Sequence, residues 1–189
     1  GKMGYCIAEE ALNRGAEVIL VSGRTHLEPP PGLEFVPVWG AEEMCEVMLR
    51  RQEECDIIIG AAAVGDFRAA QTAGQKIKKT GAGPERLVLE LVGNPDILKT
   101  LGERKQPGQI MVGFAAETED VINNARKKLK SKNLDFVVAN DVTMEGAGFA
   151  CDTNIVTLIS EDDMVSLPKM SKQEVARAIL DKVVALLNK

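Results

Sequence analysis

Short apolar runs alternate with longer helical patterns along this chain, and this alternation limits the folds that the chain can adopt. The run at 56–59, which is apolar after its first residue, is typical of a strand buried on both faces of a parallel sheet. Strands that alternate with helices predict a mostly parallel sheet with helices on both faces. The chain has 189 residues, of which 45% are hydrophobic, and this suits a single α/β domain with one sizeable core.

The expected elements follow from periodicity and from residues that start and stop helices. Strands are expected at 17–22, 35–38, 56–59, 87–91, 110–114 and 135–139, with a C-terminal hairpin at 155–159 and 164–167. Helices are expected at 5–14, 41–53, from 95, from 119 and at 172–187. Asn94 is the expected N-cap of the third helix, with Pro95 at its first position, and Thr118 is that of the fourth. Ser171 and Glu174 form a capping box for the last helix.

The start of the chain is unusual for such a fold. The segment Gly1-Lys2-Met3-Gly4 leads directly into a helix, whereas a strand and a phosphate-binding loop come first in doubly wound folds. We therefore expect the first strand to be missing from this chain. Residues 1–189 are then expected to form a single nucleotide-binding domain that is truncated at its amino terminus.

Composition and charge argue against several classes of partner. The formal net charge is −5 and the pI is near 5.1, so a general nucleic-acid-binding surface is not expected. The apolar runs are too short to cross a bilayer, and no signal peptide is recognisable. The 4 cysteines form no C-x-x-C pair and the 1 histidine, His26, follows no zinc-site spacing, so neither a zinc site nor a histidine-based mechanism is expected. The expected location is the reducing cytoplasm.

The chemistry is expected where the third predicted strand ends. The stretch 60–65 consists of small or apolar residues, which let a flat ligand approach the backbone, and Asp66 follows it. Lys76, Lys78 and Lys79 come shortly afterwards in a loop, where ammonium groups can neutralise a polyphosphate. A solvated turn is the alternative for these lysines. Because ligands gather beyond the carboxyl ends of parallel strands, one crevice is expected to contain this loop and the loops at 22–23, 114–118 and 140–141.

Seven short motifs occur in an order and at intervals that resemble a known family. They are GKMG at 1–4, LVSG at 20–23, AAV-x-DFR at 62–68, KIKK at 76–79, NPDI at 94–97, GFAAET at 113–118 and ANDV at 139–142. Together they resemble phosphopantothenoylcysteine synthetase, the ligase half of the bacterial bifunctional decarboxylase/synthetase of coenzyme A biosynthesis. The resemblance extends over essentially the whole chain.

The resemblance implies a Rossmann-like three-layer fold and phosphopantothenate–cysteine ligase activity. In that family the carboxylate of 4′-phosphopantothenate attacks the α-phosphate of CTP and expels pyrophosphate, and the amine of cysteine then displaces CMP from the acyl-cytidylate. Such chemistry needs Mg²⁺ and cationic side chains to offset the charge of the triphosphate. The resemblance also implies a homodimer with a flap at about 69–85 that reaches toward the partner, and fusion to an upstream decarboxylase domain. That upstream domain, and not this chain, would hold FMN.

Site residues follow from the resemblance, position by position. Lys76 matches the catalytic lysine, and Ala63 matches a small position close to the reacting groups. Asp66 would bind the ribose or the metal ion, and the sequence does not choose between them. Asn140, Lys78 and Lys79 are weaker candidates for substrate contacts, and an asparagine that stabilises the acyl-cytidylate would belong to the missing segment. The nucleotide contacts fall on Gly60, Ala61, Ala62, Asp66, Lys76, Pro95, Asp96, Ile97, Leu98, Phe114, Lys128 and Lys132.

Two alternatives come from other functional classes. A nicotinamide-dependent oxidoreductase would use the same fold, although no strand in the chain is followed by G-x-G-x-x-G. A non-catalytic half that only dimerises and supports a flavin-dependent decarboxylase is the other alternative. Pyrophosphate release that depends on CTP would distinguish the ligase from both of them.

Overall fold

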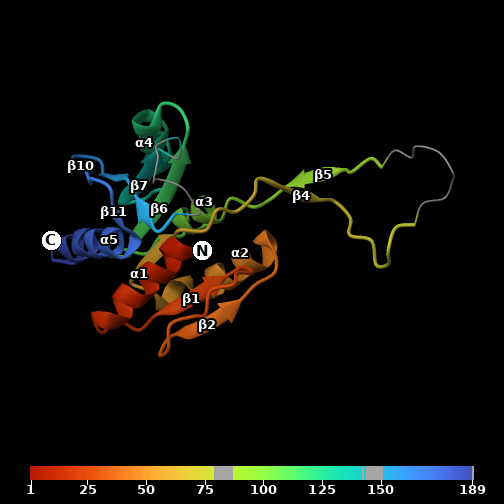
Figure 1. Cartoon of the computed structure of the whole chain (residues 1–189), viewed down its shortest axis with the longest axis horizontal. Coiled ribbons are helices and arrows are strands. Elements are labelled where there is room, and N and C mark those ends of the chain that lie inside the picture. Colours follow the sequence, from red (N-terminus) through yellow and green to blue (C-terminus); the bar gives the residue numbers. More distant parts are fainter. Residues whose placement is uncertain (79–86, 142, 144–150, 189) are drawn as a thin grey trace.

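The core of the protein is a five-stranded sheet with helices on both faces (Figure 1). The structure is a computed structural model, and it describes residues 1–78, 87–141, 143 and 151–188. The strand order is β10-β9-β7-β6-β3, in which β3, β6 and β7 are parallel and β9 and β10 are antiparallel to their neighbours. The strand bounds are β3 Ile57–Gly60, β6 Ile110–Glu117, β7 Phe136–Asp141, β9 Val156–Ile159 and β10 Met164–Ser166. The predicted α/β architecture and the C-terminal hairpin are therefore confirmed.

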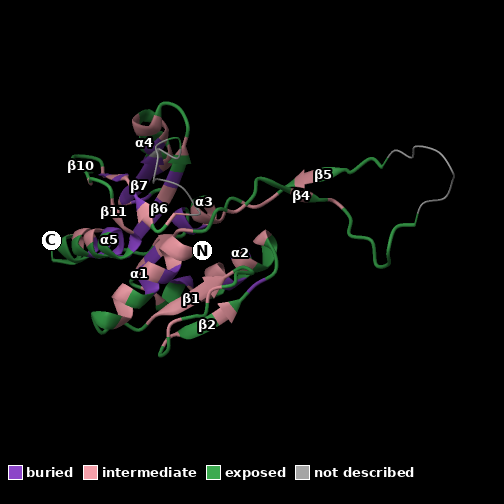
Figure 2. Cartoon of the chain, viewed as in Figure 1, coloured by how far each residue is buried: buried purple, intermediate pink, exposed green. Residues whose placement is uncertain are grey.

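Successive residues of the central strands pack into separate cores on the two faces of the sheet. In β7, Phe136 and Val138 pack against one face, and Val137 and Ala139 pack against the other. Alternation with a period of two residues is what a strand requires, and apolar residues at every position are what burial on both faces requires. Figure 2 shows the buried residues concentrated in β6, β7 and α5.

The described residues form five α-helices, which cover these two faces. Helices α1 (Lys2–Asn13) and α5 (Lys172–Leu187) supply residues to the core that contains Phe136. Residues of α2 (Ala41–Arg51), α3 (Ile97–Gly102) and α4 (Val121–Ser131) pack into the core on the opposite face. A 3₁₀ turn, η1 (Gln52–Glu54), follows α2. The three layers of the expected fold are thus present.

In the described ranges, three smaller strand pairs lie outside the main sheet. Strands β1 (Ile19–Ser22) and β2 (Glu34–Pro37) are parallel, and β8 (Thr153–Asn154) and β11 (Met170–Ser171) are antiparallel. Strands β4 (Phe67–Ala69) and β5 (Leu91–Gly93) form the base of a long arm that projects from the body of the protein (Figure 1). The arm is defined here as residues 67–78 and 87–93, and it contains the described part of the predicted flap.

The structure corrects the predicted strand at 87–91. Only Leu91 of that range belongs to a strand, β5, which pairs with β4. Leu87, Val88 and Leu89 are exposed, with 65%, 89% and 64% of their surface accessible. Their alternating pattern predicted a half-buried strand, but no layer formed by the described residues covers them.

Two predicted helix caps are wrong and one is confirmed, and α1 begins at Lys2 and not at Tyr5. Helix α3 begins at Ile97 with Asp96 as its N-cap, so Asn94 is not the cap and Pro95 is not the first helical residue. Helix α4 begins at Val121 after Asp120, so Thr118 is not its cap. Its start is later because β6 pairs with β7 as far as Glu117. The capping box of Ser171 and Glu174 is present at the start of α5.

Glycine allows α3 to contact the backbone of the loop after α4. A Cβ atom added to Gly102 would lie 2.0 Å from the Lys132 carbonyl oxygen, and the Asn133 side chain donates a hydrogen bond to the Gly102 carbonyl at 3.0 Å. Backbone atoms at such a contact cannot rotate away as a side chain would. This contact therefore fixes the end of α3 against the end of α4.

In the part of the chain that the structure describes, no helix is both long and apolar enough to cross a membrane.

We predict that Gly102→Ala destabilises the protein despite the higher helix propensity of alanine. The collision with the Lys132 backbone should lower the free energy of unfolding by about 3 kcal/mol, as overpacking of a rigid contact does. Urea unfolding followed by circular dichroism measures this change. Gly74→Ala is the matched control, since a Cβ atom at Gly74 meets nothing within 4 Å. Equal midpoints for the two variants would show that the contact is not rigid.

Candidate functional site

A cavity of about 500 Å³ lies at the carboxyl ends of β3, β6 and β7, as expected for a parallel sheet. Many residues proposed from the sequence line this one cavity: Gly60, Ala61, Ala62, Ala63, Asp66, Pro95, Asp96, Ile97, Leu98, Phe114, Lys128, Lys132 and Asn140. The predicted segments at 60–66, 114–116 and 140 meet there, but 114–116 and 140 belong to strands β6 and β7 and not to loops after them. The loop at 22–23 does not line the cavity, so that part of the prediction is wrong.

Gly60, at the end of β3, lines the cavity and also allows the Leu98 side chain to pack against the sheet. Gly60 is opposite Gly113 of β6 in the sheet, and a Cβ atom on either glycine would lie 2.7 to 3.2 Å from atoms of Leu98. The Leu98 side chain therefore covers both glycines. The small residues at 60–65 predict space for an approaching ligand, but beside Gly60 the Leu98 side chain occupies that space. The small residues at 61–63 continue along the cavity wall.

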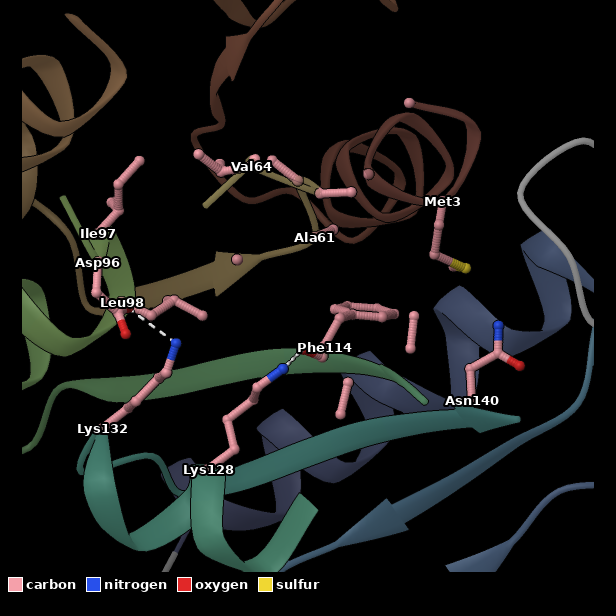
Figure 3. Close-up of a pocket in the computed structure, with 18 of the residues that line it drawn as sticks. Met3, Ala61, Val64, Asp96, Ile97, Leu98, Phe114, Lys128, Lys132 and Asn140 are labelled. Carbon is pink, nitrogen blue, oxygen red and sulfur yellow. Dashed lines mark hydrogen bonds and ion pairs between the residues drawn. The ribbon is translucent and has the colours of Figure 1, made fainter. Parts of the chain in front are cut away.

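An ion pair joins α3 to the residue that follows α4. The Lys132 Nζ atom lies 2.8 Å from the Asp96 Oδ1 atom, which also accepts a hydrogen bond from the backbone N–H of Lys99 (Figure 3). Partial burial alone would raise the pKa of Asp96, but the hydrogen bonds from Lys132 and from the Lys99 N–H outweigh it and lower the pKa below its ordinary value. Asp96 is therefore a helix cap and also the partner of a cavity cation.

A second lysine of α4 contacts the backbone of β6. The Lys128 Nζ atom donates to the Phe114 carbonyl oxygen at 3.1 Å and lies 4.0 Å from Glu117 (Figure 3). Burial lowers the pKa of Lys128, and the charge of Lys132 lowers it further. A half-buried ammonium group of this kind gains from an anionic ligand, which restores the favourable interaction lost on burial.

The two ends of the cavity are separated by Phe114. Lys128 and Lys132 lie on one side of its ring, and Met3 of α1 and Asn140 of β7 lie on the other (Figure 3). Asn140 is buried, with 9% of its surface accessible. The cavity therefore has room for an extended ligand along the carboxyl edge of the sheet.

Carboxylates that could hold a metal ion are few. Asp66 and Asp96 are the acidic residues that line the cavity, and no group of three or more metal-ligating residues occurs within the described ranges. Mg²⁺ commonly binds to one or two protein carboxylates together with substrate phosphates. The residues present fit that mode of binding and do not form a complete protein cage.

The predicted basic loop does not reach the cavity of its own chain. Lys76 and Lys78 are exposed on the arm and do not line the cavity, while Lys79 lies outside the described residues. The base of the arm is held by Arg68, which donates to the Gly93 carbonyl and to Glu42, each at 2.6 Å. The sequence placed these lysines near the strand end because they are close to it along the chain, but the arm carries them away.

Four polar residues of the cavity wall were not predicted from the sequence as site residues: Lys2, Asn94, Asn154 and Lys172. Lys2 belongs to the GKMG motif, which was used for the family resemblance and was expected to precede the first helix. Lys172 follows the capping residue Ser171, and from the sequence it was expected to be an exposed residue of an amphipathic helix. A lysine in the first turn of a helix, where the helix dipole disfavours a cation, is a signal that could have found Lys172. It could not have found Lys2, because the first helix was predicted to begin at Tyr5.

Comparisons with known proteins give a consistent result. The family model described as DFP, the DNA/pantothenate metabolism flavoprotein C-terminal domain, matches residues 1–187. The chain is 50% identical over 188 residues to the coenzyme A biosynthesis bifunctional protein CoaBC of Bacillus subtilis (strain 168), with 98% of this chain and 45% of that protein covered. It is 41% identical over 184 residues to the protein of the same name from Escherichia coli (strain K12), with 97% and 45% covered.

A solved structure agrees with this result. The crystal structure of the C-terminal domain of a coenzyme A biosynthesis bifunctional protein CoaBC matches with a TM-score of 0.83 and 42% identity, covering 100% of this chain and 83% of that one. The chain spans about half the length of the curated relatives that it matches.

We predict that Lys132→Met raises the pKa of Asp96, because burial is then opposed mainly by the N–H of Lys99. An aspartate with a lowered pKa stabilises the fold above its unfolded pKa, and this contribution is lost as the pH falls through the folded value. The variant should therefore lose that contribution at a higher pH. An NMR titration of the Asp96 carboxyl carbon measures the shift directly. The control is Lys99→Met, which keeps the backbone donor, and an unchanged pKa in Lys132→Met would refute the assignment.

Proposed function

The chain belongs to the family of the DNA/pantothenate metabolism flavoprotein C-terminal domain, and on this basis we propose that it acts as a phosphopantothenate–cysteine ligase in coenzyme A biosynthesis. CTP activates the carboxylate of 4′-phosphopantothenate as an acyl-cytidylate and pyrophosphate leaves. Cysteine then forms the amide and CMP leaves. The observation that carries the proposal is the 50% identity to a CoaBC protein over 98% of this chain.

The gathering of the expected nucleotide contacts around one cavity supports the CTP site. The backbone at 60–62 and the side chain of Phe114 would hold the base and ribose, together with the start of α3 at 95–98. Lys128 and Lys132 would contact the nucleotide from α4 and its end. Because Lys132 pairs with Asp96, its ammonium group is already positioned at the cavity wall. Preorganised charges of this kind need little rearrangement during the reaction.

Ala63 and Asp66 would lie close to the reacting groups. A residue as small as Ala63 leaves room for the carboxylate of phosphopantothenate beside the α-phosphate. Asp66 would bind the ribose or Mg²⁺, and Mg²⁺ when bound supplies charge neutralisation of the triphosphate. Asn140 is proposed as a contact to phosphopantothenate at the far end of the cavity, with Lys78 and Lys79 as further contacts from an arm.

The arm suggests a homodimer in which each active site uses residues of both copies. Phe67, Leu89 and Leu91 are 66%, 64% and 56% exposed on it, more apolar surface than a projecting hairpin normally leaves in water. We propose that the arm packs on a second copy of the chain and brings Lys76 to the partner's cavity. There Lys76 would stabilise the charge that develops on the α-phosphate.

The proposal extends to the setting of the reaction. The ligase would act in the cytoplasm on small molecules, without nucleic acid or membrane as partners. Fusion to a decarboxylase that carries FMN would allow the product to pass to the next reaction. None of the residues discussed above is proposed to contact that flavin.

The assay that tests the proposal is pyrophosphate release from CTP in the presence of Mg²⁺ and 4′-phosphopantothenate. We predict that Lys76→Gln lowers this release by a factor on the order of 10² to 10³, because a cation that stabilises the transition state is lost. CTP affinity, measured by calorimetry, should change little in the same variant. Lys99→Gln is the control, since Lys99 is an exposed lysine of α3 outside the cavity. Full activity of Lys76→Gln would remove the proposed role.

A mixing experiment tests whether the lysine acts across the dimer. We predict that Asp66→Ala weakens CTP binding and is nearly inactive alone, as is Lys76→Gln. When the two variants are mixed, a mixed dimer combines an intact cavity with an intact arm from its partner. Random exchange should then restore about a quarter of the wild-type activity. No recovery, with subunit exchange verified by mass spectrometry, would show that the arm does not act in the partner's site.

A further inference from the structure

We propose that the cavity has a second cationic end, formed by Lys2 and Lys172, that binds a phosphate group of a substrate. Both lysines line the cavity, and Lys2 adjoins Met3, which lies on the side of Phe114 opposite Lys128 and Lys132 (Figure 3). The proposal concerns a site for phosphate itself, and it rests on the proposed function only for the identity of the substrate that supplies the phosphate.

The two lysines are brought together by one short segment of the chain. The Lys2 Nζ atom lies 2.6 Å from the Asp152 Oδ1 atom, and the Lys172 Nζ atom donates to the Cys151 carbonyl oxygen at 2.5 Å. The backbone N–H of Lys172 also donates to the Asp152 carbonyl, at 3.0 Å. Adjacent residues therefore hold both ammonium groups at the same wall of the cavity.

The position of both lysines is unfavourable for local structure. Lys2 is the first residue of α1 and Lys172 is the first residue of α5. The positive end of the helix dipole disfavours a cation at these positions. Residues that break a local rule in a folded protein are expected at functional sites. An anion between the two helix starts would turn this unfavourable arrangement into a favourable one.

Burial adds to the same argument. Lys172 has 4% of its surface accessible, although lysine is among the residues least often buried. Burial lowers the pKa of Lys172, and the charge of Lys2 lowers it further. A bound anion would offset both effects, since it is close to each cation.

The surroundings suit a phosphate group. Asn154 has 4% of its surface accessible, and its Oδ1 atom accepts from the backbone N–H of Ile155 at 3.1 Å. The Asn154 side chain therefore has its NH₂ group as the donor for a hydrogen bond to a ligand. Among the described side chains that form or hold this end, Lys2 and Lys172 carry two positive charges against the one negative charge of Asp152. Ammonium and amide donors around a positive site match the oxygens of a phosphate monoester or a polyphosphate.

Calorimetric titration of the chain with inorganic pyrophosphate tests the site without any assumption about the reaction. We expect wild-type protein to bind the probe, and Lys2→Met and Lys172→Met each to weaken binding about tenfold, the effect of losing one charge-assisted hydrogen bond. Asp152→Asn should strengthen binding, because it frees Lys2 from its carboxylate. Lys127→Met is the control for a general loss of charge, since Lys127 is exposed and lies outside the cavity.

The outcomes are decisive in either direction. Lys2→Met replaces a partly exposed residue, so it tests the site even if Lys172→Met fails to fold. The proposal is overturned if wild-type protein does not bind pyrophosphate, or if every folded variant at Lys2 and Lys172 binds it as tightly as wild type. Pyrophosphate binding that depends on these lysines supports the site even if CTP turnover is absent, an outcome that would count against the ligase instead.

Competition then identifies the source of the phosphate. If the site holds the polyphosphate of the nucleotide, CTP should displace pyrophosphate and CMP should not. If it holds the phosphate monoester, 4′-phosphopantothenate should displace pyrophosphate and pantothenate should not. In either case the difference between the paired ligands should shrink about tenfold in Lys2→Met.

Discussion

The cavity depends on how closely helix α3 packs on the sheet and on the end of α4. Leu98 covers the paired glycines Gly60 and Gly113, and Gly102 contacts the backbone of Lys132. A short helix of 6 residues has little stability of its own, so these contacts determine where it lies. They bring Asp96 to the Lys132 ammonium group, and they thereby set one wall of the cavity.

The side chains that line the cavity carry a net positive charge, whereas the chain as a whole is negatively charged. The chain carries a net charge of −5, yet the cavity is lined by Lys2, Lys128, Lys132 and Lys172 against Asp66 and Asp96. Local fields in a cleft govern ligand binding, whereas net charge governs solubility and non-specific association. An anionic substrate such as CTP is therefore compatible with an acidic protein. The cations at both ends of the cavity suit a reaction that brings together two phosphorylated substrates.

Much of the fold was predictable because several strands are buried on both faces. The runs at 56–59 and 135–139 are typical of strands in a covered sheet, and the capping box of α5 was predicted from Ser171 and Glu174. The start of α3 was not, because Asn94 uses its side chain to donate to the Gly65 carbonyl at 2.8 Å and leaves the cap to Asp96. Asn94 and Asp96 were both possible N-caps of α3. The choice depended on Lys132, a residue distant in sequence that pairs with Asp96.

The sequence by itself determined the layered α/β fold, the strand ends that line the cavity and the family to which the chain belongs. These depend on local periodicity and on motifs that are short along the chain. Only the tertiary structure decided which charges meet. It carried Lys76 away on an arm, joined Asp96 to Lys132, and placed Lys2 beside Lys172 although 169 residues lie between them. Such pairings depend on how helices pack on the sheet. Packing brings together residues that are far apart in the sequence, and no local sequence pattern predicts which of them will meet.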